Sequence, residues 1–399
     1  MNGKGCAVRI LLANKFYYRR GGDCVYSIEL ENLLKSAGHE VAFFAMDYPE
    51  NLPSPWKPFW PGEIAFSPKK PGAFFKAFRR PFGDGETVTK FKALLDHFKP
   101  DVVHLNNIHT QLSPVIAEIA HSRGIKVVWT LHDYKLVCPA YTCYCNGKIC
   151  EECITGKKSA CTSKKCLKNN WLASKIAEKE ALCWNRERLE KCVDVFICPS
   201  RFMKSKMEQG GFTASKLVAI HNFVDGVKFV HQPVERENAY CYVGRLSSEK
   251  GVETLLRVAS NIEAPLYVLG TGPLEAELKS KFAQSGHIHF MGHCGWDECK
   301  SVLLKSKFSV VPSEWYENNP FSVIEPLCLG TPVLGANVGG IPELIEPGKS
   351  GELFEMGVAE DLEAKIRLML GRDYSFDVAP LWEHFSKVNY LEQMMSVYG

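Results

Sequence analysis

The chain has 399 residues, which is more than one ordinary hydrophobic core organises, so its length predicts two domains. Hydrophobic residues make up 46% and charged residues 23%, which excludes a largely disordered chain, and no apolar stretch approaches the ~20 residues of a membrane-spanning helix. The net charge of +3 divides unevenly, because residues 1–200 hold 29 Lys and Arg against 20 Asp and Glu, whereas residues 201–399 hold 19 against 25. A basic first half suggests an anionic surface or partner.

A strand, a loop, a helix and a second strand open the chain. Residues 8–14 form an apolar run of strand length, residues 25–37 have helical apolar spacing, and a second strand starts at residue 41. This order is typical of a βαβ unit, whose first loop lies at the carboxyl edge of a parallel sheet, where ligands bind. Gly21 and Gly22 in that loop let the backbone come close to a ligand, although a glycine pair also suits a tight turn without one.

Residues 51–85 interrupt this alternation with aromatic and basic side chains among several prolines. Such a mixture suits an anionic membrane surface, which residues 56–80 would contact, and a long surface loop with its aromatics tucked under the domain is the alternative. Nothing else in the chain supports nucleic acid as the partner. The residues concerned are Trp56, Phe59, Trp60, Phe66, Phe74, Phe75, Phe78, Lys57, Lys69, Lys70, Lys76, Arg79 and Arg80.

Regular alternation resumes with strands over residues 101–106 and 126–131 around a helix over residues 114–122. The second of these strands ends at His132, at the same edge as the glycine loop. A histidine at that edge is a candidate site residue, although a lone histidine is more often structural.

A cysteine-rich excursion over residues 138–166 follows, and then a charged amphipathic helix over residues 170–192 and a strand over residues 193–198. Cys150 and Cys153 have the C-x-x-C spacing of a structural zinc knuckle, which Cys138 with Cys161 or Cys166 could complete as a set of four thiolates; we take Cys166 as the fourth. The remaining alternatives are reduced free thiols and redox-active disulfides.

A second α/β series begins after a link over residues 226–237. Its first strand, residues 239–243, leads into Gly244, and Arg245 and Lys250 follow five residues apart, a spacing suited to clamping a diphosphate. A Gly-x-Gly pair ending at Gly272 lacks the third glycine of a dinucleotide fingerprint, which disfavours a dehydrogenase. Since the chain has no Asp-x-Asp pair, the sequence offers no evident magnesium clamp.

An apolar strand over residues 308–313 leads into a polar loop, which carries the main candidate site residues of this half. The spacing predicts that Ser322 caps a helix starting at Val323, with the helix dipole and the loop N–H groups forming an anion site. Glu317 and Glu325 beside that site are acceptors suited to the hydroxyls of a sugar and a ribose. The alternatives are a capping box between Ser322 and Glu325 and a solvated loop acid at Glu317.

The last segment, over residues 376–398, is largely helical in pattern. We therefore expect an N-terminal domain over residues 1–225, a second domain over residues 226–374, and a C-terminal helix over residues 375–399 that crosses back to the first domain. The start of the chain lacks a signal-peptide pattern, which predicts a cytoplasmic protein.

In order, these motifs resemble the family 4 retaining glycosyltransferases (glycosyl transferases group 1), which have the GT-B fold of two facing Rossmann-like domains with an inter-domain cleft. The resemblance covers nearly the whole chain. It rests on Gly21-Gly22, Gly38-His39-Glu40-Val41, Asp101-Val102-Val103-His104, Leu131-His132-Asp133, Gly244-Arg245-x4-Lys250-Gly251, Gly270-x-Gly272, Phe290-x-Gly292, Glu317-x7-Glu325, Gly330-Thr331-Pro332-Val333 and Gly339-Gly340-x-Pro342-Glu343.

The resemblance implies a role for each matching residue. Arg245 and Lys250 would neutralise the donor diphosphate, Glu325 would bind the ribose, and Glu317 would bind the transferred sugar, which His132 would also contact. Backbone groups at Gly21, Gly22, Gly244 and Gly272 would approach the donor. The chain departs from the commoner Phe-Gly loop at Asn318, Asn319, Pro320, Phe321 and Ser322, whose backbone donors should survive the change.

The expected function is therefore hexosyl transfer from a nucleotide-diphosphate-sugar to a glycan or lipid-linked acceptor. The family implies retention of anomeric configuration, and we expect no catalytic metal or cofactor, with structural zinc as the one metal considered. Polysaccharide biosynthesis at the inner membrane face, with peripheral attachment, is the expected setting. The alternatives are a sugar-nucleotide epimerase of the same fold and a non-catalytic metal- or membrane-binding protein.

Overall fold

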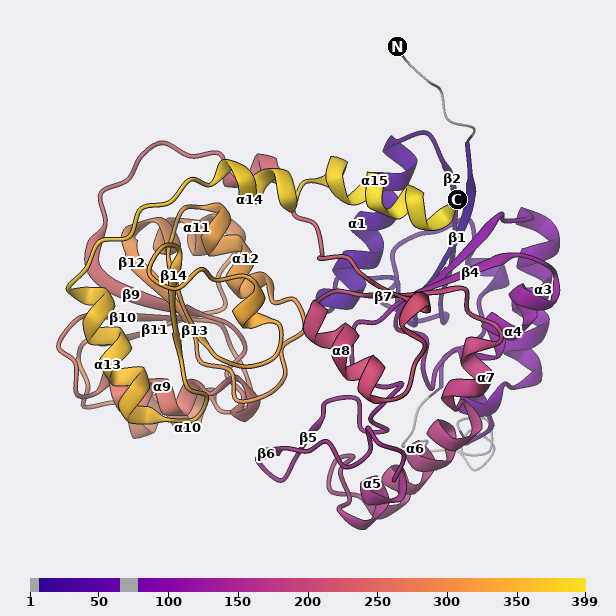
Figure 1. The fold of residues 1–399 in the computed structure, drawn as a ribbon, viewed down its shortest axis with the longest axis horizontal. Coiled ribbons are helices and arrows are strands. Elements are labelled where there is room, and N and C mark those ends of the chain that lie inside the picture. The colour runs from indigo at the N-terminus through magenta and orange to yellow at the C-terminus, as the bar shows by residue number, and fades with distance from the viewer. Residues whose placement is uncertain (1–6, 65–77) are drawn as a thin grey trace.

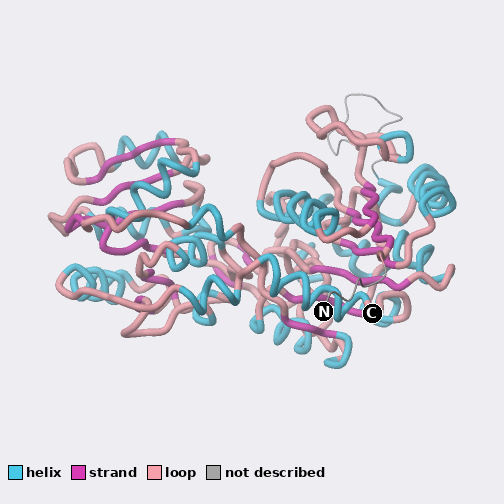
Figure 2. Tube along the Cα trace, turned by 90° about the horizontal axis from the view of Figure 1, so that it is seen from above, coloured by secondary structure: helices cyan, strands magenta, loops and turns pink. Residues whose placement is uncertain are grey.

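The computed structural model describes residues 7–64 and 78–399 and shows two α/β lobes (Figure 1). Each lobe has a six-stranded parallel sheet, with strand orders β2-β1-β3-β4-β7-β8 and β11-β10-β9-β12-β13-β14. Viewed from above, the lobes lie side by side (Figure 2). The predicted α/β class with two facing Rossmann-like domains is confirmed.

The sheet of the N-terminal lobe is built from short apolar strands, because helices cover both faces of a parallel sheet and leave no face for polar residues. The strands are β1 Arg9–Ala13, β2 Glu40–Phe44, β3 Val102–Leu105, β4 Lys126–Thr130, β7 Val195–Cys198 and β8 Leu217–Ala219. The helices are α1 Gly22–Ser36, α3 Gly85–Phe98, α4 Val115–Ser122, α5 Ser159–Ser163, α6 Trp171–Cys183, α7 Arg186–Glu190 and α8 Arg201–Gln209. A small antiparallel hairpin, β5 Tyr144–Cys145 and β6 Lys148–Ile149, lies in the cysteine-rich segment.

The C-terminal lobe repeats this plan around a second core. Its strands are β9 Glu237–Val243, β10 Leu266–Leu269, β11 Ile288–Gly292, β12 Ser306–Val311, β13 Val333–Ala336 and β14 Gly351–Phe354. Its helices are α9 Val252–Ala259, α10 Glu275–Lys281, α11 Trp296–Lys305, α12 Phe321–Cys328 and α13 Ala359–Leu370.

The chain crosses between the lobes twice, and the two crossings lie together. Phe223 packs in the first core and Val224 in the second, and the Val224 N–H donates to the Phe385 carbonyl at 2.9 Å. The returning segment forms two helices rather than the single one predicted, α14 Ala379–His384 and α15 Lys387–Tyr398, along the top of Figure 1. Side chains of α15 pack into the first core, namely Tyr390, Met394, Val397 and Tyr398.

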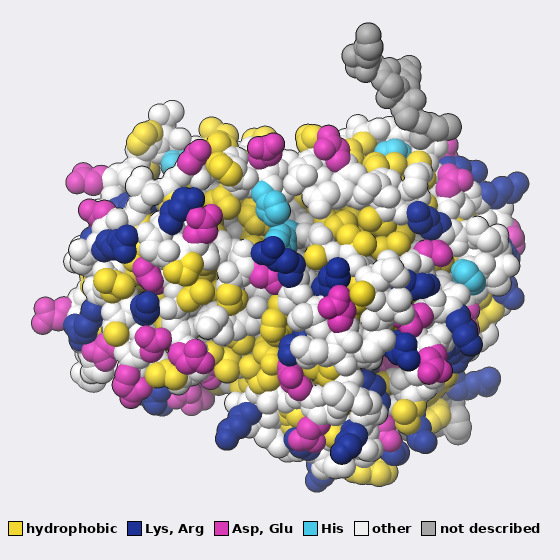
Figure 3. Space-filling view, in the orientation of Figure 1, with side chains coloured by type: hydrophobic (Ala, Val, Ile, Leu, Met, Phe, Trp, Pro, Cys, Tyr) yellow, Lys and Arg dark blue, Asp and Glu magenta, His cyan; other side chains and the backbone are white. Residues whose placement is uncertain are grey.

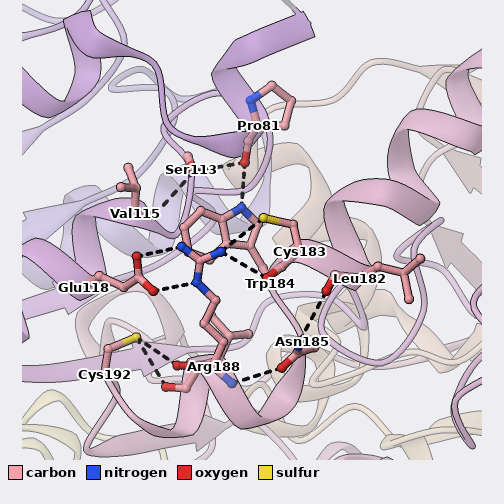
Figure 4. Close-up of polar contacts among 11 residues, drawn as sticks. Pro81, Ser113, Val115, Glu118, Leu182, Cys183, Trp184, Asn185, Arg188 and Cys192 are labelled. Atoms are coloured by element: carbon pink, nitrogen blue, oxygen red, sulfur yellow. Dashed lines mark hydrogen bonds and ion pairs between the residues drawn. The ribbon is translucent and has the colours of Figure 1, made fainter.

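The charged helix predicted over residues 170–192 is broken in the structure at Trp184 and Asn185. The Asn185 side chain accepts from the Arg188 N–H at 3.0 Å and so caps α7, while the Trp184 indole donates to the Pro81 carbonyl at 2.7 Å (Figure 4). The Arg188 guanidinium stacks 3.9 Å from the centre of the Trp184 ring and donates to both carboxylate oxygens of Glu118, at 2.6 and 2.9 Å. Long-range partners of Trp184 and Arg188 therefore override helical periodicity here.

Replacing Arg188 with Lys should lower the melting temperature by ~2–4 °C, corresponding to roughly 1 kcal/mol, because a lysine cannot hold both Glu118 oxygens and stack at once. Thermal unfolding measures the shift, with Arg186→Lys as the control, since Arg186 contacts Glu190 within its own helix. Equal melting temperatures for the two variants would contradict this account.

The basic and aromatic segment is partly structural. Trp60 is buried and its indole donates to the Phe43 carbonyl at 2.8 Å, and the fully buried Arg80 pairs with Asp84 at 2.6 Å and Glu86 at 3.0 Å. These two side chains cannot face a membrane, which corrects the prediction for them. Phe66, Lys69, Lys70, Phe74, Phe75 and Lys76 lie outside the described residues. No helix within residues 7–64 and 78–399 is both long and apolar enough to cross a bilayer.

Candidate active site

Glycine-lined turns at the carboxyl ends of β9 and β10 pack backbone against backbone. A Cβ on Gly270 would lie 1.9 Å from the Gly244 carbonyl oxygen, and a Cβ on Gly272 would lie 2.3 Å from the carbonyl oxygen of Leu246. Gly251, with a φ of +65°, would place a Cβ 1.9 Å from the Pro312 oxygen. These glycines therefore hold the loop that carries Arg245 and Lys250 against its neighbours, a role that the spacing alone did not reveal.

Glu317 is the centre of a buried ionic cluster. Its Oε1 accepts from Lys250 Nζ at 2.6 Å, from Ser313 Oγ at 2.7 Å and from Trp315 Nε1 at 3.0 Å. Burial raises the pKa of Glu317, but the Lys250 charge and these hydrogen bonds outweigh burial and hold the pKa below its usual value. Glu317 is thus an ionised carboxylate rather than a solvated loop acid.

Arg245 lies on the same loop as Lys250 but is exposed. Its carbonyl accepts from the Tyr242 hydroxyl at 2.8 Å, and its side chain has no ion-pair partner in the part of the chain that the structure describes. Lys250 is therefore already paired with Glu317, whereas the Arg245 guanidinium is available for an anion.

Helix α12 begins at Phe321, and its N-cap is Pro320 with φ −74° and ψ 123°. The predicted cap at Ser322 is wrong, because the fixed φ of proline already starts the helix there and places Ser322 inside the first turn. The capping-box alternative fails for the same reason. The first N–H groups of α12, at Phe321 and Ser322, have no partner within the helix.

Glu325 lies in the second turn of α12 and is largely enclosed. Burial raises the pKa of its carboxyl to about 7, and the Lys228 charge offsets this only in part. Two glutamates eight residues apart thus differ in ionisation, since Glu317 has three donors within hydrogen-bond distance and Glu325 is dominated by burial.

The facing edge of the N-terminal lobe holds the other predicted residues. Gly21 is the N-cap of α1 and Gly22 its first residue, and a Cβ on Gly22 would meet nothing within 4 Å. His132 Nε2 lies 3.0 Å from Asn106 Oδ1, and burial lowers the pKa of His132 to about 4, so its imidazole is neutral at pH 7.

Three further residues at this edge were missed in the sequence. Asp23 Oδ2 accepts from Asn107 Nδ2 at 3.0 Å and lies 4.0 Å from Lys15 Nζ. Burial raises the pKa of Asp23, but Lys15 and the Asn107 hydrogen bond hold it below its usual value. Lys15 and Asn107 come directly after predicted strands and Asp23 directly after the glycine pair, which was the available signal, since strand ends of a parallel sheet meet at one edge.

The carboxyl edges of the two sheets meet at residues that are next to Glu317 and His132 in the chain. Asn318 Nδ2, one residue after Glu317, donates to the carbonyl of Leu131, one residue before His132, at 3.0 Å. A cleft of about 560 Å³ lies between the lobes, where hydrophobic side chains gather (Figure 3), but none of Arg245, Lys250, Glu317, Glu325, Gly21 and His132 lines it. Its lining comes from both lobes and includes Ile149, Phe202, Tyr316, Val338, Pro342 and Met356. A second cavity, of about 360 Å³, lies near Arg9 and Glu40, at the opposite edge of the first sheet.

The four cysteines predicted as one zinc site do not share a centre. Cys166 Sγ lies 3.3 Å from Cys145 Sγ, Cys138 is hydrogen-bonded to Cys143, and Cys150 Sγ accepts from Lys164 Nζ at 3.6 Å, whereas Cys153 lies in none of these contacts. Among the residues described, no three His, Cys, Asp or Glu side chains are grouped so that they could hold a metal ion. Structural zinc at these four cysteines stays a prediction, since Cys138 also lies close enough to Cys153 and to Cys166 for their charges to interact.

Two family models match the chain. Residues 20–226 match the model described as Glycosyltransferase Family 4, and residues 225–375 match Glycosyl transferases group 1. The sulfoquinovosyl transferase SQD2 of Arabidopsis thaliana is 26% identical over 292 residues, which are 68% of this chain and 50% of that protein. The chain spans only 50 to 62% of the length of the first curated relatives that it matches.

Solved structures share the whole fold. Sucrose-phosphate synthase from Thermosynechococcus elongatus superposes with a TM-score of 0.68 at 18% identity, covering 98% of both chains. Anabaena Alr3699/HepE in complex with UDP and glucose gives a TM-score of 0.66 at 15% identity, covering 98% of this chain and 99% of that one. With the family models, these likenesses show that the chain belongs to glycosyltransferase family 4 and has the GT-B fold.

Proposed function

We propose that this glycosyltransferase moves a hexose from a nucleoside-diphosphate-sugar to a glycan or lipid-linked acceptor, with retention of anomeric configuration and without a catalytic metal. The observation that carries the proposal is the Lys250–Glu317 pair, whose lysine lies on the same loop as the exposed Arg245 at the carboxyl edge of the second sheet. A cation pair suited to a diphosphate adjoins a carboxylate suited to sugar hydroxyls, as transfer from such a donor requires.

The chemistry places opposite charges at the two ends of the breaking bond. As the bond to the diphosphate breaks, negative charge grows on the departing phosphate, where Arg245, Lys250 and the free N–H groups at the start of α12 stabilise it. Glu317 accepts from hydroxyls of the sugar and holds it in place. The leaving phosphate oxygen takes the acceptor proton, so no side chain is assigned as general base.

His132 acts in this scheme as a neutral hydrogen-bonding group. Its lowered pKa keeps it uncharged at pH 7, and with Nε2–H directed at Asn106 the other ring nitrogen accepts from a sugar hydroxyl. Gly22 has open space next to its Cα, which allows backbone N–H groups to approach the donor phosphates from this lobe.

A thermal-shift screen against UDP-, GDP-, ADP- and dTDP-sugars tests the donor, because a ligand at 100 times its Kd stabilises by ~2.7 kcal/mol. The HepE structures hold UDP or UDP-glucose, so UDP-glucose is the first donor to examine. Product NMR then reads the anomeric configuration, and a chelator added to the assay should leave the rate unchanged. Interconversion of the sugar nucleotide without an acceptor would favour the epimerase alternative, and donor binding without turnover would favour a non-catalytic role.

We also infer that the protein, a cytoplasmic one, attaches peripherally to an anionic membrane through the exposed Phe78 and Arg79. Combining Phe78→Ser with Arg79→Glu should reduce binding to phosphatidylserine vesicles at least about fivefold, since each cation near such a surface contributes about 1 kcal/mol. Co-sedimentation measures the bound fraction. Lys92→Glu, an equal charge change on the exposed face of α3, should have a smaller effect, and equal losses would contradict the inference.

A further inference from the structure

Tyr316, the residue before Glu317, is inserted into a socket on the N-terminal lobe. Its hydroxyl donates to Glu151 Oε1 at 2.6 Å, and its ring centre lies 4.7 Å from that of Phe202. Lys206 Nζ lies 2.5 Å from the same Glu151 oxygen and 5.3 Å from the Tyr316 ring. Glu151, in the cysteine-rich segment, thus supplies the acceptor that fixes a tyrosine of the other lobe.

Asn318, the residue after Glu317, is also held by the N-terminal lobe. Its Oδ1 accepts from Ser200 Oγ at 2.8 Å, and its Nδ2 donates to the Leu131 carbonyl at 3.0 Å. Asn319 Oδ1 accepts from the N–H of Asn222, near the crossing between the lobes, at 2.8 Å. Both functions of the Asn318 amide are used across the lobe boundary, which explains an amide at a position where the family more often has another residue.

Glu317, between Tyr316 and Asn318, turns back to its own lobe, where Lys250, Ser313 and Trp315 donate to it. Its backbone is held there too, because the Gly340 N–H donates to the Glu317 carbonyl at 2.8 Å. A Cβ on Gly340 would lie 1.8 Å from the Asn318 oxygen, so the two loops pack without space for a side chain. The carboxylate is therefore clamped between attachments to both lobes.

We propose that Tyr316 and Asn318 are positioning residues for Glu317, so that the N-terminal lobe sets the orientation of the carboxylate that receives the transferred sugar. This inference rests on the proposed role of Glu317 in binding that sugar. Hydrogen bonds on both sides of one residue fix its peptide planes, and a loop freed on one side samples orientations in which the carboxylate misses the sugar. Arg245 and Lys250 lie on a different loop, whose backbone is held by glycine contacts rather than by Tyr316 or Asn318, so the diphosphate site should change less than the sugar site.

The test uses the full chain with Tyr316→Phe, Asn318→Ala and Glu151→Gln, the last acting from the opposite lobe. UDP and UDP-glucose serve as probes in calorimetry, and transfer is followed in steady state. We expect the Kd for UDP to stay within ~3-fold of wild type, while the preference for UDP-glucose over UDP disappears and kcat falls about tenfold. Combining Glu151→Gln with Tyr316→Phe should give little further loss of preference, because both act on the hydrogen bond from the Tyr316 hydroxyl, and loss of the charge partner of Lys206 should appear only as lower stability.

Glu152→Gln is the matched control, since Glu152 is the neighbour of Glu151 and pairs with Lys164 of its own segment. It should behave as wild type. Equal loss of UDP and UDP-glucose affinity, or unchanged preference and kcat, would overturn the positioning role, because a merely structural contact lowers stability without separating the two ligands.

A different result would contradict the proposed function rather than the positioning role. If Glu317→Ala in the otherwise wild-type chain leaves the preference for the sugar nucleotide unchanged, Glu317 does not bind the sugar, and the inference falls with its premise. If the wild type binds neither probe, the nucleotide and sugar nucleotide selected by the thermal-shift screen replace them in the same comparison, which then decides the positioning role.

Discussion

Replacing Arg245 with Met is expected to lower the turnover of sugar transfer about 100-fold or more. Arg245 is exposed and its side chain has no ion-pair partner in the described part of the chain, so its charge is available to the departing phosphate and contributes little to folding. Loss of one preorganised charge opposite a developing anion typically costs a factor of ~10²–10³ in rate. Steady-state transfer measures the loss, and the melting temperature should stay unchanged.

Lys250→Met should cause a similar loss of turnover but also lower the stability, because it leaves the buried Glu317 carboxylate without its charged partner. Arg257→Met, which removes an exposed cation from α9 of the same lobe, is the control and should keep the wild-type rate. Near-normal turnover in both Arg245→Met and Lys250→Met would contradict the proposal that this loop binds the diphosphate.

Glu325→Gln is expected to weaken donor binding about tenfold at pH 8 while making the protein more stable. The carboxylate accepts ribose hydroxyls in the proposed scheme, and hydrogen bonds to a charged group are worth ~1.5–3 kcal/mol. Burial raises the pKa of Glu325 to about 7, so ionisation above that pH places a charge in an enclosed site and destabilises the folded state.

The sign of each pH dependence follows from this raised pKa. Between the usual carboxyl value and pH 7 the folded state holds the Glu325 proton more tightly than the unfolded chain, so this group makes stability fall as the pH rises through that window. The stability gain of Glu325→Gln should therefore be largest at pH 8 and vanish near pH 4. Donor affinity of the wild type should fall as the pH drops below 7, up to tenfold per unit, whereas the variant should be less sensitive.

Thermal unfolding and donor titrations between pH 5 and 8 measure both effects. Glu277→Gln, an exposed acid on α10, controls for the general loss of a negative charge. A Glu325→Gln variant with wild-type affinity at pH 8 would remove Glu325 from the ribose site.

Local patterns were sufficient where one energetic term dominates. Apolar runs such as residues 126–131 must be buried on both faces, so they predict parallel strands without knowledge of their neighbours. Parallel strands in turn place their following loops at one edge, which is why His132, Arg245 and Glu317 could be chosen from their places in the chain. The order of glycine and charged motifs predicted the family, which the family models confirmed.

Local patterns failed where a distant partner outweighed a local preference. The Ser322 cap lost to the backbone geometry of Pro320, and helical spacing over residues 170–192 lost to contacts of Trp184 and Arg188 with Pro81 and Glu118.

By itself, then, the sequence determined the alternation of strands and helices, the division into two lobes and the loops that could carry chemistry, because each depends on periodicity and on the geometry of parallel sheets. Only the tertiary structure decided that Lys250 lowers the pKa of Glu317, that burial raises the pKa of Glu325 to about 7, and that Tyr316 and Asn318 tie the acidic loop to the other lobe. Burial and partners 67 to 187 residues away set these properties, and neither is encoded in local spacing.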